Sequence, residues 1–356
     1  MTVFTSVLAS LQQWSNPPTN YIGTFIFLTY IFSALLLTLA LSSHLRELFE
    51  SIRVNDGESA TLRHLTAIAY LSFAVLSYHM ASFLVQSYQN WSKNVGIPVP
   101  EPPYELKPLD WMLQSSLFTD FVHDVLGKGE NWTVVWVPGA LLWTGAMNIW
   151  MALEGRRYGV QGLWQYFVLA QILPISFAQN LFSIELVLQR ASETTVHNRN
   201  QSLSPGQEKQ KSVTARKKYL DILDALYLAT LVYMGLYRIG LLQKSSDMSQ
   251  LMGNAIVVRA LLFAPWFLTF RAMPPSDETT AKGSRALQQT ARTPLYTMFM
   301  ATMAIPAVML IGQAANRIPA NQYTALHTWQ GLNSGMAVRA LACDSIIGTM
   351  SFFLTY

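Results

Sequence analysis

The sequence predicts an all-α fold, a polytopic membrane bundle of about eight transmembrane helices. Of its 356 residues, 51% are hydrophobic and only 12% are charged, against about 25% charged residues in soluble domains. The charges gather in connecting segments and leave apolar stretches close to the roughly 20 residues that cross a bilayer. Because these stretches leave little length for a soluble domain, we expect residues 1–356 to form a single transmembrane domain.

The first four expected spans follow from apolar length and from polar or Pro/Gly-rich breaks. They cover residues 21–41, 62–85, 134–153 and 163–188. A proline-rich stretch, 97–108, follows the second span, and the amphipathic residues 110–126 after it are expected to form a short interfacial or re-entrant helix. Pro174 interrupts the fourth span. Because proline removes a backbone donor, it predicts a kink there.

The last four expected spans occupy the C-terminal part of the chain. They cover residues 220–242, 251–270, 295–315 and 334–356. Before them lies a polar segment, 190–218, which is rich in Lys and Arg and has Ser-Pro-Gly at its centre. This composition predicts a disordered loop. Its positive charge indicates that the loop, and with it both termini, faces the cytosol.

Glu185 is the leading candidate for an acid inside the membrane. On a continuous fourth span it would share one face with Gln171, Ala178, Phe182 and Gln189. A polar stripe of this kind favours the protein interior over lipid. A buried carboxyl favours its neutral form, which can donate a proton. The alternative is a structural role, in an ion pair or in reaching towards the membrane surface.

Two further charged residues, Arg339 and Asp344, lie in the last expected span. Five positions apart on a helix, they do not face each other, so each needs a partner on another helix. Arg259 and Arg238 are candidate partners for Asp344. An ion pair would keep Asp344 charged, which counts against it as a proton donor, although it remains a rival to Glu185.

Two acidic pairs raise a different hypothesis. Asp120 and Asp124 are four residues apart, and Asp221 and Asp224 begin the fifth expected span, so each pair shares a helical face. Such pairs could bind Mg²⁺ and a diphosphate, and they resemble the metal-binding motifs of UbiA-type membrane prenyltransferases. The Asn and Arg that accompany the first motif in that family are absent here, and each pair is shorter than the family pattern. Asp120 and Asp124 are therefore also rival acids for a metal-free reaction.

Three tryptophans follow one face of the third expected span. Trp136, Trp143 and Trp150 are seven residues apart, and Tyr166 and Phe182 on the next span extend the aromatic surface. One interpretation is helix packing. The other is an aromatic wall whose ring faces stabilise a carbocation, because a ring face attracts positive charge.

The sequence contains no metal-ligand spacing among its histidines, no phosphate-binding loop, no dinucleotide fingerprint and no nucleic-acid motif. We therefore expect no cofactor and no nucleic-acid partner. The single cysteine, Cys343, excludes a disulfide within the chain.

Two segments carry a resemblance to a known family: Ala-Leu-Glu-Gly-Arg-Arg-Tyr-Gly at 152–159 and Pro-Ile-Ser-Phe-Ala-Gln-Asn-Leu-Phe at 174–182. With the chain length, the number of spans and the basic loop, they resemble the fungal integral-membrane terpene cyclases of meroterpenoid biosynthesis, of the ascochlorin, ascofuranone and macrophorin type. The resemblance implies a farnesylated aromatic substrate, often with a terminal epoxide. An acid would protonate it and start a carbocation cyclisation, and no diphosphate would leave.

The first hypothesis is therefore a membrane terpene cyclase of the endoplasmic reticulum, acting without metal or cofactor on a lipophilic prenylated small molecule in contact with lipid. Its catalytic candidates are Glu185, Asp120, Asp124 and Asp344. Its expected substrate contacts are Trp136, Trp143, Trp150, Phe182, Gln171 and Arg339. The alternatives are a Mg²⁺-dependent aromatic prenyltransferase and a receptor or transporter without catalysis.

Overall fold

The computed structural model describes residues 20–52, 54–96, 107–122, 133–200, 257–263, 265–266 and 336–355. Within these ranges every regular element is an α-helix and none is a strand, which confirms the all-α class. The expected spans 220–242 and 295–315 lie outside the described residues, and the expected span 251–270 is described only in part.

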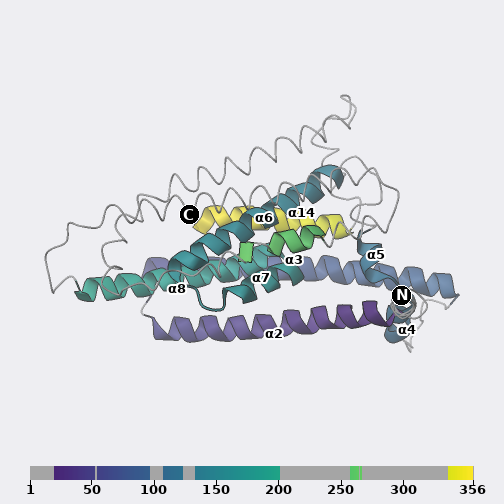
Figure 1. The fold of residues 1–356 in the computed structure, drawn as a ribbon, viewed down its shortest axis with the longest axis horizontal. Coiled ribbons are helices and arrows are strands. Elements are labelled where there is room, and N and C mark those ends of the chain that lie inside the picture. The colour runs from purple at the N-terminus through teal and green to yellow at the C-terminus, as the bar shows by residue number, and fades with distance from the viewer. Residues whose placement is uncertain are drawn as a thin grey trace, which may run out of the picture.

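The described bundle contains five long helices and three short ones, and residues 257–263 and 265–266 are also helical (Figure 1). In chain order they are α2 (Tyr21–Ser51), α3 (Asp56–Val95), α4 (Pro108–Gln114), α5 (Leu117–Val122), α6 (Thr133–Tyr158), α7 (Leu163–Ile172), α8 (Ile175–Asn200) and α14 (Met336–Thr355).

Helix α8 lies at the centre of the described bundle, in contact with α2, α3, α6, α7 and α14. Every residue from 175 to 188 is buried, so this part of α8 has no face towards the outside. Its apolar side chains join the main hydrophobic cluster with Met147 and Trp150 of α6 and Phe167 of α7. A helix buried on all sides must satisfy each of its polar side chains through its neighbours.

Pro174 does more than kink the fourth expected span, because it divides that span into two helices. Helix α7 ends at Ile172, Leu173 is extended, and α8 begins at Ile175. The two helices pack against each other as a hairpin. Helix α7 has 10 residues and is about 15 Å long, half the thickness of a bilayer core. The prediction of one interrupted helix over 163–188 was therefore wrong: the chain turns back at Pro174.

The polar segment after the fourth expected span also differs from the prediction. Residues 190–200 continue α8 as a helix, so the expected disordered loop does not begin at Arg190. The physical reason is local: this stretch contains neither Pro nor Gly, and the Ser-Pro-Gly break comes only after residue 200. The remainder of the segment, 201–218, lies outside the described residues.

Two of the described helices, α2 and α3, are long and apolar enough to cross a membrane. They contain the first two expected spans. Helix α2 has 31 residues and is about 46 Å long, more than the roughly 30 Å of a bilayer core. Its start is fixed by Asn20, whose side chain accepts a hydrogen bond from Gly23 N at 2.9 Å. Helix α3 ends at Val95, and Gly96 after it has a positive φ of 70°, which suits glycine.

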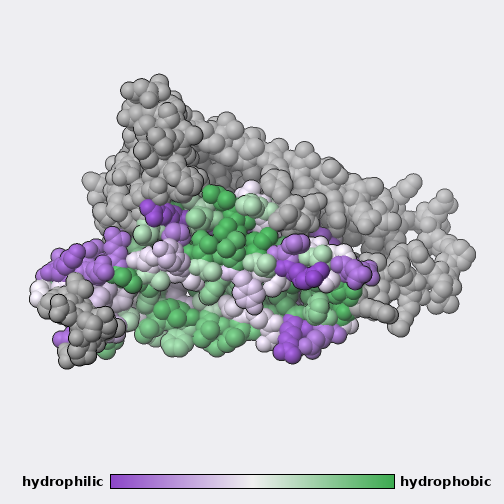
Figure 2. Space-filling model, turned by 180° about the vertical axis from the view of Figure 1, so that it is seen from behind, coloured by the Kyte–Doolittle hydropathy of each residue, from purple (hydrophilic) through white to green (hydrophobic). Residues whose placement is uncertain are grey.

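The outer surfaces of α2 and α3 are apolar. Exposed side chains on α2 include Phe25, Phe32, Leu35 and Leu36. Figure 2 shows hydrophobic residues gathered across the middle of the described surface, with hydrophilic residues towards its two ends. An exposed apolar surface of this extent is unusual for a soluble monomer and is what lipid contact requires.

Short helices close one end of the bundle, where an interfacial or re-entrant helix was expected at 110–126. Helix α4 packs on both α2 and α3, and Asn20 binds the segment after it through a hydrogen bond from Nδ2 to Ser115 O at 2.9 Å. Trp111 of α4 is buried against Trp91 of α3. Because these contacts fix α4 to the ends of two long helices, the connection between α3 and α6 is anchored.

We predict that the middle of α2 faces lipid and that its C-terminal end faces water. Leu36 is 65% exposed, and the side chain of Arg46 is 80% exposed. In a Cys343→Ser background, Arg46→Cys should react with a charged maleimide in open membrane sheets, because its thiolate forms in water. Leu36→Cys should react only after detergent is added. Equal labelling of both positions in intact membranes would contradict lipid contact along α2.

Candidate functional site

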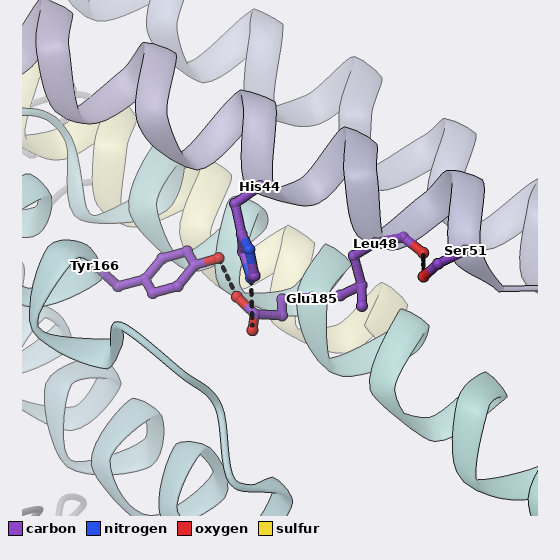
Figure 3. Close-up of polar contacts among 5 residues, drawn as sticks. All are labelled: His44, Leu48, Ser51, Tyr166 and Glu185. Carbon is purple, nitrogen blue, oxygen red and sulfur yellow. Dashed lines mark hydrogen bonds and ion pairs between the residues drawn. The ribbon is translucent and has the colours of Figure 1, made fainter.

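Glu185 of α8 lies at the centre of a small polar cluster in the apolar core (Figure 3). Its side chain is fully buried, with 0% exposure. The hydroxyl of Tyr166 on α7 donates a hydrogen bond to Oε2. On the other side, Nε2 of His44 on α2 lies 3.4 Å from Oε1. We call these three residues the acid cluster; they come from three different helices.

The hairpin at Pro174 brings Tyr166 to Glu185. The two residues are 19 positions apart in the sequence, so a continuous helix would separate them by about 28 Å along its axis. Because α7 turns back along α8, their side chains meet instead. Tyr166 is itself fully buried, and its hydroxyl therefore needs a partner in the core, which Glu185 supplies.

His44 links the acid cluster to the outside of the bundle. Its side chain is 39% exposed, although Nε2 lies beside a carboxyl with no exposure. The contact between Nε2 and Oε1 can form in two ways: the imidazole donates to a carboxylate, or a protonated carboxyl donates to a neutral imidazole. A proton can thus be held on either side of this contact.

From the sequence, Glu185 was predicted as a buried acid, but His44 and Tyr166 were not predicted as its hydrogen-bond partners. Tyr166 was noted only as an aromatic residue, and His44 showed no metal-ligand spacing. A usable signal was nevertheless present. His44 follows the apolar stretch of α2 directly after Ser42 and Ser43, and a histidine at the end of a span is a candidate for proton exchange with water.

A chain of aromatic rings runs from the acid cluster into the bundle. Tyr166 and Phe182 have ring centroids 5.5 Å apart, and Phe182 and Trp150 are 5.1 Å apart. Phe352 of α14 continues the chain at 5.8 Å from Trp150 and 6.2 Å from Trp143. All four pairs are edge-to-face, a favourable geometry for aromatic packing.

This arrangement is compatible with both interpretations of the tryptophan stripe, helix packing and an aromatic wall for a carbocation. Trp143 and Trp150 contact the same ring, Phe352, so they do share a face of α6. Trp150 is 2% exposed and belongs to the main core, which fits packing. Trp143 is only partly buried. Trp136 lies on α6, and its side chain is outside the part of the chain that the structure describes.

Asp344 of α14 caps the N-terminus of α8. Ile175 N donates to Oδ2 at 3.0 Å, and Ser176 N donates to Oδ1 at 2.9 Å. The hydroxyl of Ser176 also donates to Oδ1 and pairs with the hydroxyl of Ser72 on α3. The first N–H groups of a helix have no partner within it, and a negative charge there is favoured by the helix dipole.

Of the two arginines expected as partners of Asp344, Arg259 does not pair with it, because Asp344 binds a helix end. Arg259 instead donates to the backbone oxygen of Gln171 and lies 3.4 Å from the hydroxyl of Tyr30. Arg238 lies outside the described residues. Because three donors occupy the two oxygens of Asp344, this carboxylate has a structural task, and Glu185 is the better placed of the two as an acid.

A second polar surface of α8 faces away from the acid cluster. Gln179 Nε2 donates to Gly348 O of α14 at 3.1 Å, and Asn180 accepts from the hydroxyl of Ser351. Gly348 is required here, since a Cβ at this position would collide with Nε1 of Trp143. Gln179 and Asn180 belong to the segment 174–182 that carries the family resemblance. The polar stripe that the sequence predicted between Gln171 and Gln189 did not include them.

The remaining candidates do not join the acid cluster among the described residues. Asp120 of α5 is exposed, and its Oδ1 lies 3.4 Å from the hydroxyl of Ser116.

Asp124, Asp221 and Asp224 lie outside the described residues, so the two acidic pairs are untested. Gln171 is the penultimate residue of α7, and Arg339 is partly buried on α14. In the described ranges, no three His, Cys, Asp or Glu residues gather as metal ligands.

Comparison with known proteins found no match of any kind. No family model, no curated protein and no solved structure is significantly similar to this chain. The resemblance to membrane terpene cyclases therefore stays a prediction, and the function must be argued from the site.

We predict that Asp344→Ala destabilises the protein strongly. It leaves two buried N–H groups without an acceptor, and each such loss costs about 1–3 kcal/mol. Asp344→Asn should be less harmful, because one amide oxygen can still accept. Thermal unfolding of the detergent-solubilised protein measures this order. Glu50→Ala removes an exposed acid that pairs with Arg46 and should change the stability little. Equal unfolding temperatures for Asp344→Ala and the wild type would contradict the capping role.

Proposed function

We propose that this chain is a multi-pass membrane terpene cyclase that protonates a farnesylated aromatic substrate and so starts a carbocation cyclisation. The observation that carries the proposal is the acid cluster: a fully buried carboxyl, Glu185, with a tyrosine hydroxyl on one oxygen and a half-exposed imidazole on the other. A chain of aromatic rings begins at the same tyrosine. Proton donation followed by cation stabilisation needs these two features together.

Glu185 is the proposed proton donor. Its proton passes to the oxygen of a terminal epoxide, which opens to a hydroxyl and a tertiary cation, or to a carbon of the terminal alkene. Internal alkenes of the farnesyl chain then attack the cation in turn, and the sequence ends when a carbon next to the final cation loses a proton to a water molecule acting as the base. The net change is an isomerisation, so no oxidant, reductant or leaving group is needed.

Tyr166 is a positioning residue in this mechanism. Because its hydroxyl donates to Oε2, it fixes the orientation of the carboxyl and leaves Oε1 as the oxygen that exchanges protons. The same hydrogen bond stabilises the carboxylate that remains after donation. Catalysis by a preorganised group of this kind requires no rearrangement of the site during the reaction.

The aromatic rings near Glu185 are proposed to stabilise the moving cation. Phe182 lies one turn before Glu185 on α8 and contacts both Tyr166 and Trp150. A cation over a ring face gains about 0.5–2 kcal/mol, more when water is excluded. Trp143 and Phe352 extend this surface towards α14. Gln171 is a candidate contact for the polar ring of the substrate, since its buried Nε2 has no hydrogen-bond acceptor among the described residues.

The membrane setting is part of the proposal. The apolar lengths of α2 and α3 support membrane insertion, and the further expected spans would make the protein multi-pass. A farnesylated phenol partitions into a bilayer, so an enzyme within the endoplasmic reticulum membrane would meet its substrate there. Neither the prenyltransferase nor the receptor hypothesis has a supporting observation in the described residues.

We predict that Glu185→Gln abolishes cyclisation while the protein still inserts and binds substrate. The amide keeps the shape and can still accept from Tyr166, but it has no proton to donate. Turnover should fall by about 10²–10⁴-fold, the contribution typical of a general acid. The measurement is product formation from farnesylated phenols, with and without a terminal epoxide, in microsomes at equal protein level.

The comparison variants for this experiment are Asp120→Asn and Asp124→Asn, which should remain active. A parallel reaction with a metal chelator should also proceed, whereas a Mg²⁺-dependent prenyltransferase would stop. Normal cyclisation by Glu185→Gln, with a dead Asp120 or Asp124 variant, would show that the donor is elsewhere. Product formation that requires both a prenyl diphosphate and Mg²⁺ would replace the proposed function by the prenyltransferase hypothesis.

We predict different outcomes for two substitutions of Trp143. Trp143→Phe keeps a ring face and should retain much of the activity, whereas Trp143→Leu keeps only hydrophobic volume and should lose far more. Product formation per folded protein measures the difference. If the two variants are equally active, Trp143 serves helix packing alone.

A further inference from the structure

We propose that His44 is the proton-uptake residue of the acid cluster: it takes a proton from water and passes it to the Glu185 carboxylate after each turnover. This inference rests on the proposed function and deepens it: it assigns the route by which the buried acid regains its proton. His44 acts through Glu185 and not on the substrate, so we describe it as a positioning and relay residue.

The need for such a residue follows from the chemistry and the burial together. Cyclisation takes a proton from Glu185 and releases a different proton from a carbon of the product to a water molecule at the other end of the substrate. The Glu185 carboxylate therefore lacks a proton after every cycle. Glu185 has 0% exposure and cannot take a proton from water directly. A second group must carry the proton across the distance between water and Oε1.

The geometry selects His44 for this task among the described residues. Oε2 of Glu185 is bound by Tyr166, which is itself fully buried. Oε1 lies 3.4 Å from Nε2 of His44, and the side chain of His44 is 39% exposed. The imidazole ring thus contacts the buried carboxyl and also reaches the outside of the bundle. Figure 3 shows the His44 side chain extending from its helix towards Glu185.

The position of His44 along α2 also suits proton uptake. Leu41, one turn before it, is buried in the core, and the polar end of the helix follows. There Arg46 and Glu50 form an exposed ion pair at 2.8 Å. In a bilayer this places His44 at the boundary between the apolar stretch and the aqueous surface, where an imidazole can exchange protons with water.

The transfer step is a simple proton relay. The imidazolium of His44 gives its Nε2 proton to Oε1 of the Glu185 carboxylate, which leaves a neutral imidazole and a neutral carboxyl. The half-exposed ring then takes the next proton from water. Among the described residues, the titratable groups in contact on this path are Tyr166 on α7, Glu185 on α8 and His44 itself, and the charged residues Arg46, Glu47 and Glu50 follow His44 along α2.

The test distinguishes a proton-relay role of His44 from a structural role. It compares the rate of the first turnover with the steady-state rate. His44→Gln keeps a side-chain N–H that can donate to Oε1, but an amide cannot carry a proton between water and Glu185. Its first turnover should stay near the wild-type rate, because a single cycle uses only the proton that Glu185 gained before substrate was added and needs no renewed proton uptake. Its steady-state rate should fall by about 10²-fold, the lower end of the contribution typical of a proton-transferring group. Added imidazole buffer should restore the steady-state rate of His44→Ala.

The matched control is His64→Gln, because His64 is an exposed histidine on the neighbouring chain segment, α3. It should leave both rates and their pH dependence unchanged. If the first turnover and the steady-state rate of His44→Gln fall equally, and imidazole does not restore His44→Ala, His44 is structural and the inference is overturned.

A second measurement keeps the inference testable if no farnesylated phenol is cyclised by the wild type. Hydrogen–deuterium exchange of the Glu185 carboxyl can be followed by infrared difference spectroscopy in membranes, with Glu185→Gln to assign the band. Slower exchange in His44→Gln than in the wild type supports the relay even if the cyclase proposal fails. Equal exchange rates, or the absence of a protonated Glu185 band, overturn it.

Discussion

The contact between Asp344 and the first turn of α8 is the interaction on which the rest of the described structure depends. A helix that begins inside a dry core leaves backbone N–H groups without water to bind them, at a cost of several kcal/mol. Pro174 removes one such group, and Asp344 binds the next two from another helix. This cap allows α8 to begin in the interior, and it joins α14 and α3 to α8 through Ser176 and Ser72.

The position of the reactive acid follows from that helix start. Because α8 begins directly after Pro174, α7 can turn back along it, and Tyr166 reaches Glu185 instead of lying about 28 Å away along a continuous helix. The two polar surfaces of α8 then have separate tasks. The surface with Ser176, Gln179 and Asn180 binds α14 and α3, and the surface with Glu185 meets α7 and α2.

The aromatic core has a double role in this picture. Trp150, Tyr166 and Phe182 are among the most buried side chains of the described bundle, so they stabilise it through close van der Waals and edge-to-face packing. The same rings lie beside the acid. A site built from core residues is rigid, which suits a reaction that depends on a fixed proton donor. Substitutions of these residues also affect folding, so the activity of each variant must be compared at an equal amount of folded protein.

The sequence by itself determined the all-α class, the two apolar helices α2 and α3, a disturbance of the helix at Pro174 and the choice of Glu185 as a buried acid. Apolar length and helical periodicity are local properties, and they can be read from neighbouring residues. Only the tertiary structure decided that Pro174 makes a hairpin, that Asp344 caps a helix where an arginine partner was expected, and that His44 and Tyr166 bind Glu185. His44 and Glu185 are 141 residues apart, and Asp344 and Ser176 are 168 apart. Such partners are chosen by how helices pack, because every buried polar group must find a donor or acceptor on whichever helix lies beside it.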